Sequence, residues 1–423
     1  MPHARPSAPQ RTLGVGDAPQ LAIVVAAGFH TATGATPSAL ARLGAGRYHV
    51  AILAARDVVD PGSAFHDLVR EAAVLHWQAN LSSFAPLLEV ARSLRGTVPQ
   101  VATVHHLEPG EEQKLAALEG AADIVHVPAA QVGELVRSRV PHLPVVEAPY
   151  LVDAPTFGRG WRTWVRPWQD RGVAPFQVGW TGMSSGLDDR KRLDVVVRAA
   201  VEARRSVPEL RLELSGRMPA EVLELARRYR LPVRRWPWRR WHARWEFFRA
   251  LDCYLSCSSV EGGTLPVFEA AVAGRPVITT PVGLAAELLA AGGGVEVAIG
   301  DVDATVEALV ALAGLSAAER ASQGARDGAR ADAIVGRQGR LAYDHLWSLA
   351  GRPVATTSWG PAAVADHNAE VLRRDAVIEG CDLVRHGRRT QAALAAADGR
   401  VWRLEPLERR DAMASLRGAI LRR

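Results

Sequence analysis

Short apolar runs alternate with helical patterns along most of the chain, and this alternation limits the fold more than any other feature. The runs show little period-two alternation of apolar and polar residues, which is typical of strands covered by helices on both faces of a parallel sheet. Helical patterns such as residues 84–95 lie between them. The predicted strands are residues 21–29, 48–55, 73–77, 100–106, 123–129 and 144–149, then 176–182, 210–216, 231–236, 251–259, 274–280 and 294–300. Two successive βα repeats predict an α/β chain with two Rossmann-like domains and ligands beyond the carboxyl ends of the strands.

The length and one break in the pattern predict the domain organisation. A chain of 423 residues is longer than one hydrophobic core usually supports. The βα rhythm stops in a segment rich in Gly, Pro and Trp and resumes after it. We therefore expect a disordered N-terminus (1–20), a first Rossmann-like domain (21–153), a connection (154–175), a second Rossmann-like domain (176–350) and a C-terminal extension (351–423).

Composition argues against several classes of protein. The formal net charge of +6 is mild for a nucleic-acid-binding protein, and most of it comes from the C-terminal extension, where 13 Arg outnumber 9 Asp and Glu. Three cysteines form neither a metal quartet nor a disulfide framework, which fits a reducing cytoplasm. Residues 21–29 are interpreted as a strand and not as a signal peptide, because they lack a convincing cleavage site. No run approaches the roughly twenty apolar residues that span a bilayer.

Residues 258–288 carry the most informative pattern. An apolar strand leads into a loop with Glu261, Gly262 and Gly263, and a helix then begins with Pro in its first turn and Glu269 one turn later. The glycines allow backbone N–H groups to approach an anion or a sugar, and the helix N-terminus adds positive potential for a diphosphate. The two carboxylates can each hold hydroxyl groups of an extended ligand. The alternative is that Glu269 only favours the helix N-terminus and Glu261 is a solvated loop residue.

This stretch resembles the donor-binding signature of glycosyltransferase family 4, the group 1 glycosyltransferases, which are retaining enzymes with the GT-B fold. The family pattern is E-x7-E, a helix of small residues, G-x-P-V-I and a glycine turn. A weaker similarity extends from about residue 21 to residue 350, and residues 343–350 look like the closing helix of the family. The matching residues are Glu261, Glu269, Gly274, Pro276, Val277, Ile278 and Gly283. The resemblance implies an acceptor domain and a nucleotide-sugar donor domain that face each other across a cleft.

The resemblance also implies roles for single residues. Glu269 would bind the nucleotide ribose, and Glu261 would reach the donor sugar. Gly34, in the loop after the first strand, would approach the diphosphate. His105 would lie beside the reacting sugar, because residues 102–106 match the T-x-H setting of the family. His106 is a rival for that role, and either histidine can instead be a hydrogen-bonded strand-end residue.

The phosphate-binding pair is where the chain departs from the family. Met183 stands where an Arg is expected, and Arg192 stands where a Gly is expected. Lys191 remains, in a chain whose only other lysine is Lys114, and a compact ammonium group suits a crowded phosphate site. Arg190 is the candidate for the second positive charge. The alternative is that residues 190–192 form a solvated basic run.

Residues 234–245 combine four Trp with five Arg. Arginine next to tryptophan suits base stacking, phosphate contact and wet interfaces equally well. The aromatic residues recur at helical spacing, so most of them are expected to form a buried stripe with the arginines in solvent. Trp236 and Arg239 are nearest the strand end and are the candidates for a nucleobase pocket. The predicted stripe is Trp238, Trp241, Trp245 and Phe248.

The resemblance implies a retaining glycosyltransferase, in which Lys191, a second Arg and helix N-termini, and not a metal ion, would stabilise the leaving diphosphate. It would use a nucleotide diphosphate sugar as co-substrate and no cofactor, with a glycan, a lipid-linked molecule or a small molecule as acceptor. Its expected location is the cytoplasm, with a peripheral contact at the inner face of the membrane left open. Two alternatives remain: a GT-B binding scaffold without activity, and a nucleic-acid-modifying transferase. We assign catalysis to His105, Lys191 and Glu261, and donor binding to Gly34, Arg190, Lys191, Gly262, Gly263, Thr264, Leu265 and Glu269.

The C-terminal extension lies beyond the part that resembles the family. Its apolar residues are too numerous for a disordered linker, and its net charge is too positive for a core segment. We expect it to fold onto the body of the protein and to reach back toward the first domain. Arg385, Arg388 and Arg389 would then face solvent, an acidic acceptor or anionic lipid. The alternative is an appendage that completes the fold and binds no partner.

Overall fold

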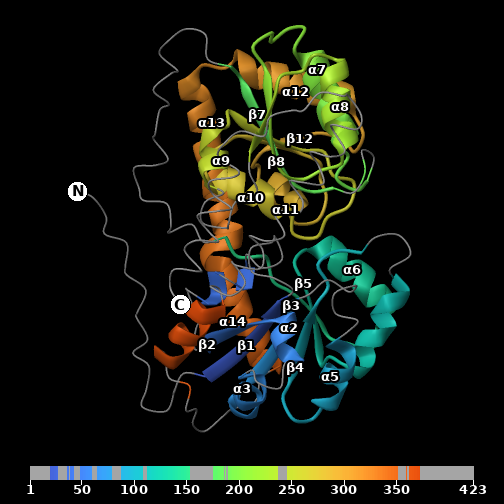
Figure 1. Cartoon of the computed structure of the whole chain (residues 1–423), viewed down its shortest axis with the longest axis vertical. Helices are drawn as coiled ribbons and strands as arrows, with labels where there is room; N and C mark the ends of the chain where they lie inside the picture. Colours follow the sequence, from blue (N-terminus) through green and yellow to red (C-terminus); the bar gives the residue numbers. More distant parts are fainter. Residues whose placement is uncertain are drawn as a thin grey trace, which may run out of the picture.

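The computed structural model contains two parallel six-stranded sheets, one formed by the first part of the chain and one by the second (Figure 1). All strand pairs in both sheets are parallel, and each of the predicted runs overlaps one of the strands. None of the described helices is long and apolar enough to cross a membrane. The structure describes residues 20–26, 36–37, 39–41, 48–59, 64–78, 87–107, 112–152, 175–184, 186, 189–236, 245–350, 359 and 362–371.

The N-terminal sheet has the strand order β2-β1-β3-β4-β5-β6. Its strands are mostly apolar and buried, and separate buried clusters fill the two sides of the sheet. Its strands are β1 (Gln20–Ala26), β2 (Tyr48–Ala54), β3 (Val74–Gln78), β4 (Gln100–Thr103), β5 (Ile124–Val127) and β6 (Val145–Glu147). Its helices are α2 (Ala55–Val58), α3 (Phe65–Glu71), α5 (Leu88–Ser93), the 3₁₀ helix Glu112–Gly120, and α6 (Ala130–Arg139).

The C-terminal sheet has the strand order β12-β11-β10-β7-β8-β9. From β7 the successive strands are added toward one edge of the sheet, and from β10 they are added toward the other edge. The boundary between β7 and β10 is therefore a switch point of strand order, the place beyond which α/β folds bind ligands. Its strands are β7 (Gln177–Met183), β8 (Arg211–Arg217), β9 (Val233–Trp236), β10 (Cys253–Ser256), β11 (Val277–Thr279) and β12 (Val295–Glu296). Its helices are α7 (Leu193–Ala203), α8 (Ala220–Arg228), α9 (Trp245–Ala250), α10 (Leu265–Val272), α11 (Leu284–Ala290), α12 (Val302–Gly314) and α13 (Ala317–Asp332).

The chain returns to the N-terminal sheet at its end. After α13 the helical path is interrupted at Gly336, and α14 (Gln338–Ala350) then packs under β1 and β2 (Figure 1). Tyr343 and Trp347 of α14 are fully buried there. Sequence analysis placed residues 338–350 in the second domain, whereas their packing places them on the first sheet. The exact domain boundaries stay predictions, because residues 153–174 lie outside the described part.

A further helix, residues 362–371, covers the edge strand β2. The side-chain amide of Asn368 accepts a hydrogen bond from the backbone N–H of Ile52 (2.9 Å) and donates one to the carbonyl of Val50 (2.7 Å). Asn368 thus pairs with β2 much as a neighbouring strand would, which blocks an edge that could otherwise pair with another chain. This part of the C-terminal extension folds back onto the first domain, as expected. Arg385, Arg388 and Arg389 lie outside the described residues.

A buried chain of hydrogen bonds connects α14 with three strands. Trp347 donates its indole N–H to His76 Nδ1 (3.1 Å), and His76 Nε2 lies 2.8 Å from Thr103 Oγ1. Thr103 Oγ1 is also 2.8 Å from His126 Nδ1, and His126 Nε2 is 2.8 Å from the carbonyl of Ala148. Since an indole can only donate and a carbonyl can only accept, every hydrogen in this chain has a defined place with both imidazoles neutral. Burial lowers the pKa of His76 well below its usual value and the pKa of His126 to about 4.

Candidate active site

The two domains touch where the loop after β10 meets the end of β4. A β-carbon added to Gly262 would overlap the carbonyl oxygen of His105, and one added to Gly263 would overlap the ring of Tyr150. No residue with a side chain fits at either position without moving one domain from the other. Sequence analysis expected these glycines to approach a ligand, and the structure shows that they also allow contact between the domains.

Hydrogen bonds from α6 strengthen the same contact. The backbone N–H of Gly283 donates to Gln131 Oε1 (2.9 Å), and Gln131 Nε2 donates to the carbonyl of Pro281 (3.3 Å). Glu287 accepts a hydrogen bond from the N–H of Ala130, in the first turn of α6, at 3.3 Å. A carboxylate from the C-terminal domain therefore caps a helix of the N-terminal domain.

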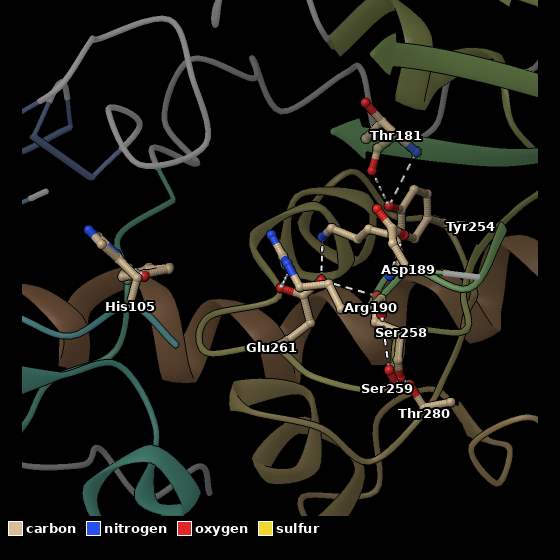
Figure 2. Close-up of polar contacts among 11 residues, drawn as sticks. His105, Thr181, Asp189, Arg190, Tyr254, Ser258, Ser259, Glu261 and Thr280 are labelled. Atoms are coloured by element: carbon tan, nitrogen blue, oxygen red, sulfur yellow. Dashed lines mark hydrogen bonds and ion pairs between the residues drawn. The ribbon is translucent and has the colours of Figure 1, made fainter. Parts of the chain in front are cut away.

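Glu261 is the centre of a charged cluster in this loop (Figure 2). Its Oε2 atom lies 3.0 Å from Arg190 Nη1, and its Oε1 atom accepts hydrogen bonds from Lys191 Nζ and from Ser258 Oγ, the latter at 3.0 Å. Burial alone would raise the pKa of Glu261, but Lys191 and Arg190 outweigh it and lower the pKa to about 2. Glu261 is therefore ionised near neutral pH, and the three charged side chains together carry a net charge of +1. Its interpretation as a solvated loop residue is wrong.

Backbone hydrogen bonds hold this cluster in place. Ser259 donates its N–H to the carbonyl of Arg190 (2.8 Å), so the loop after β10 is tied to the loop after β7. Thr280 Oγ1 donates to the carbonyl of Ser258 (2.6 Å), and Leu284 donates its N–H to the carbonyl of Gly262 (2.7 Å). Because three strands contribute to this network, the charges of the cluster are fixed relative to the C-terminal sheet.

Arg192 stands where the family pattern has Gly, and it keeps a backbone conformation that suits glycine. Its backbone is left-handed (φ 47°) at the start of α7, a conformation that glycine adopts without strain and that other residues rarely take. The Arg192 side chain forms two hydrogen bonds with Asp194, at 2.9 and 3.0 Å. Of the three neighbouring cations, Arg190 and Lys191 therefore contact Glu261, and Arg192 contacts a different acid. Met183, at the end of β7, is 48% exposed.

The second acid of the E-x7-E motif lies in the helix that follows the loop after β10. Glu269 belongs to α10 and has a fully buried side chain, so it is not an ordinary surface carboxylate. Thr264 precedes α10 in a left-handed conformation (φ 39°), and both Thr264 and Leu265 are buried. Strained backbone of this kind persists where the surrounding structure enforces it, often at functional sites. Pro266 occupies the first turn, as expected.

His105 follows β4 in the N-terminal domain and lies apart from the Glu261 cluster, at the left of Figure 2. Its side chain is buried, and its Nδ1 atom is hydrogen-bonded to the hydroxyl of Tyr150. Burial, with a smaller contribution from His106, lowers the pKa of His105 to about 3. His106 is half-buried and close enough to Glu261 to help lower its pKa. Sequence analysis missed Tyr150, which carries no motif and follows β6 in a short loop.

The remaining predicted residues lie around or outside this cluster. Trp236 is half-buried and donates its indole N–H to Glu213, and the guanidinium of Arg234 lies 4.5 Å from the centre of its ring. Trp245 and Phe248 of the predicted aromatic stripe are buried, as expected. Gly34, Trp238, Arg239 and Trp241 lie outside the described residues. Among the residues that can be described, no group of three or more His, Cys, Asp or Glu side chains is arranged to hold a metal ion.

The sequence of the C-terminal domain matches a known family. Residues 176–314 match the model of the family described as Glycosyl transferases group 1. This part of the chain is thus similar in sequence to the group 1 glycosyl transferases. The matched segment contains Arg190, Lys191, Glu261 and Glu269, whereas His105 lies before it. No curated protein matches the sequence of the chain.

Solved structures share the fold of this chain. HepE of Anabaena, in complex with UDP and glucose, has a TM-score of 0.60 at 15% identity, covering 78% of this chain and 99% of HepE. Sucrose-phosphate synthase of Thermosynechococcus elongatus has a TM-score of 0.59 at 18% identity, with coverages of 78% and 99%. A variant of S. aureus TarM in complex with UDP has a TM-score of 0.53 at 10% identity; the match covers 65% of this chain and 55% of the TarM chain. These likenesses confirm the predicted GT-B fold.

Proposed function

We propose that the protein transfers a sugar from a UDP-sugar donor to an acceptor, with retention at the anomeric carbon and without a metal ion. The observation that carries this proposal is the cluster of Glu261, Arg190 and Lys191, which lies beside the contact between the domains and within the segment that matches group 1 glycosyl transferases. The choice of UDP rests on HepE, whose structures hold UDP and UDP-glucose. The family resemblance supplies the expectation of retention.

The cluster suits stabilisation of a leaving diphosphate. Arg190 and Lys191 share one carboxylate, so one positive charge remains for an anionic ligand. A diphosphate that contacts both cations would draw them from Glu261, and Glu261 would then be able to accept hydrogen bonds from donor-sugar hydroxyls. Loss of one well-placed electrostatic group typically lowers the rate by about a hundredfold or more. The family resemblance supplies the expectation of metal-independent transfer, in which Arg190 and Lys191 would stand in place of a metal ion at the diphosphate.

The other proposed roles follow the fold. Glu269 would bind the ribose, and the backbone from Gly262 to Leu265, at the start of α10, would face the diphosphate. Gly34 would approach the diphosphate from the N-terminal domain. His105 has a buried Nε2 atom for a hydroxyl of the donor sugar. The acceptor hydroxyl would attack from the face that the diphosphate leaves, through a transition state of oxocarbenium character, and no covalent nucleophile is required.

The acceptor and the location belong to the same proposal. The carboxyl ends of the N-terminal strands face the donor loop, so the acceptor, a glycan, a lipid-linked molecule or a small molecule, would bind there. Cys253 and Cys257 are free and buried, which fits a cytoplasmic protein. A peripheral membrane contact is tested with the C-terminal extension below.

A panel of nucleotide sugars tests the proposal. A donor present at about 100 times its Kd should stabilise the folded state by roughly 2.7 kcal/mol, which a thermal melt detects. The stabilising donor is then incubated with the protein, and release of UDP with and without candidate acceptors is followed. Release of UDP supports a glycosyltransferase, whereas tight binding without release identifies the non-catalytic scaffold. Stabilisation by DNA in place of a nucleotide sugar would contradict the proposal.

A further inference from the structure

We propose that Tyr150 is a positioning residue: its ring is fixed in the core of the C-terminal domain, and its hydroxyl group fixes the orientation of His105. This inference rests on the proposed transfer reaction. Tyr150 follows the last strand of the N-terminal sheet and contacts both domains. The orientation of His105 would therefore depend on contact between the two domains.

The ring of Tyr150 belongs to the C-terminal core. It lies in the same buried cluster as Leu265 and Phe268 of α10, although Tyr150 precedes the second sheet in sequence. Gly263 packs against the ring edge so closely that a β-carbon at that position would overlap it. The loop after β10, which contains Gly263, and the ring of Tyr150 therefore hold each other in place.

The hydroxyl group of Tyr150 faces the other way, toward His105. It is hydrogen-bonded to Nδ1, and the two ring centres are 5.5 Å apart with an angle of 53° between the planes. Burial, followed by electrostatic interactions with Tyr343 and Glu261, raises the pKa of Tyr150 well above its usual value, so the hydroxyl stays protonated.

This hydrogen bond decides which ring nitrogen of His105 is left for a ligand. The low pKa of His105 keeps the imidazole neutral, so its two nitrogens differ in their hydrogen-bonding roles. With Nδ1 bound to Tyr150, the buried Nε2 atom is the nitrogen left for another group, either the backbone of Gln78 or a sugar hydroxyl. Without the phenol hydroxyl, the ring can turn over and exchange the two nitrogens. A partner that fixes one imidazole nitrogen commonly sets the role of the other.

Tyr150→Phe separates the packing of the ring in the C-terminal core from the hydrogen bond to His105, because it keeps the ring and removes the hydroxyl. We expect kcat to fall about three- to tenfold, the size of one lost neutral hydrogen bond, with donor Kd changed less than about twofold. His105→Ala and the double variant complete a cycle, in which Tyr150→Phe should cause no further loss once His105 is absent. Tyr48→Phe is the matched control, because Tyr48 is another buried tyrosine of the N-terminal domain and should leave kcat unchanged.

Two results would overturn the proposal: wild-type kcat in Tyr150→Phe, or an equal loss in the presence and absence of His105. A second measurement does not require turnover and therefore separates this proposal from the proposed function. The ¹⁵N NMR signals of the His105 ring are identified by their disappearance in His105→Ala. Tyr150→Phe should shift them toward a mixture of tautomers, and Tyr48→Phe should not. Unchanged His105 signals in Tyr150→Phe would exclude the positioning role even if no donor is found.

Discussion

Lys191 and Glu261 are 70 positions apart in sequence and form an ion pair whose side chains are only 12% and 9% exposed. Shielding from water makes such a pair more sensitive to substitution than a surface pair. Removal of the lysine leaves a buried carboxylate with Arg190 as its remaining cation. The first prediction follows from this geometry.

Lys191→Ala should lower kcat by about a hundredfold or more, because a cation that stabilises the leaving diphosphate is lost. Lys191→Arg keeps the charge but changes its position and should retain part of the activity. Steady-state kinetics with a saturating donor measures both effects. Lys114→Ala is a suitable control, since Lys114 is the other lysine of the chain and is exposed. Full activity in Lys191→Ala would mean that Arg190 alone serves the phosphate.

Glu269→Gln should weaken donor binding by roughly 1.5 to 3 kcal/mol, because the ribose hydroxyls would lose a carboxyl oxygen as hydrogen-bond acceptor. Gln is chosen because the side chain is fully buried and Ala would leave a cavity. Calorimetric titration with the donor measures the change, and a thermal melt checks that the variant folds. An unchanged Kd in a folded variant would exclude the ribose assignment.

Gly262→Ala should reduce activity and separate the domains, because the new methyl group would overlap the carbonyl of His105. Small-angle X-ray scattering should show a larger radius of gyration. Gly314→Ala is the matched control, since a β-carbon there meets no atom within 4 Å. Wild-type scattering and kinetics in Gly262→Ala would show that the close contact between Gly262 and His105 is needed neither to hold the domains together nor for activity.

The free energy of unfolding should fall as the pH decreases, because the buried chain of hydrogen bonds contains the neutral histidines His76 and His126. The pKa of His126 is about 4 in the folded state and about 6.5 in an unfolded chain, so above pH 6.5 its contribution is complete. As the pH falls below 6.5 the unfolded chain binds the proton first, and stability is lost at about 1.4 kcal/mol per pH unit for each such histidine until the folded pKa is reached.

The midpoint of urea unfolding at pH 7.5 and at pH 5 tests this expectation. At pH 5 the loss attributable to His126 is roughly 2 kcal/mol. His126→Gln should be less stable than wild type at pH 7.5 but should lose less on acidification. Equal losses in the two proteins would mean that His126 does not titrate between the folded and unfolded states.

Truncation after Ala350 should yield an aggregation-prone protein, because Asn368 would no longer cover the backbone of β2 at Ile52 and Val50. Truncation after Val371 keeps this contact and should give a folded protein that binds donor. Activity toward the acceptor and binding to anionic vesicles are then compared with the full chain. Losses confined to these two assays would assign a recognition role to residues 372–423. A soluble, stable product ending at Ala350 would contradict the role of Asn368.

The strands could be predicted because buried parallel strands are continuous apolar runs, and β1 and β10 are clear examples. The pairing of Arg190 and Lys191 with Glu261 could not be predicted, because three neighbouring basic residues look alike in sequence and the backbone turn at Arg192 decides which acid each one meets. Tyr150 was missed for a related reason. Its role depends on contacts with His105 and Gly263, which are distant in sequence.

The position of α14 and the helix at residues 362–371 has a consequence for synthesis on the ribosome. The N-terminal sheet is translated first, yet Tyr343, Trp347 and Asn368, which cover its face and edge, are among the last described residues to be made. The strands and helices of the C-terminal sheet lie between residues 177 and 332, so all of them are synthesised before those residues. The second domain in the sequence is therefore the first that can complete its core, and the first domain waits until residues 343–368 have been made.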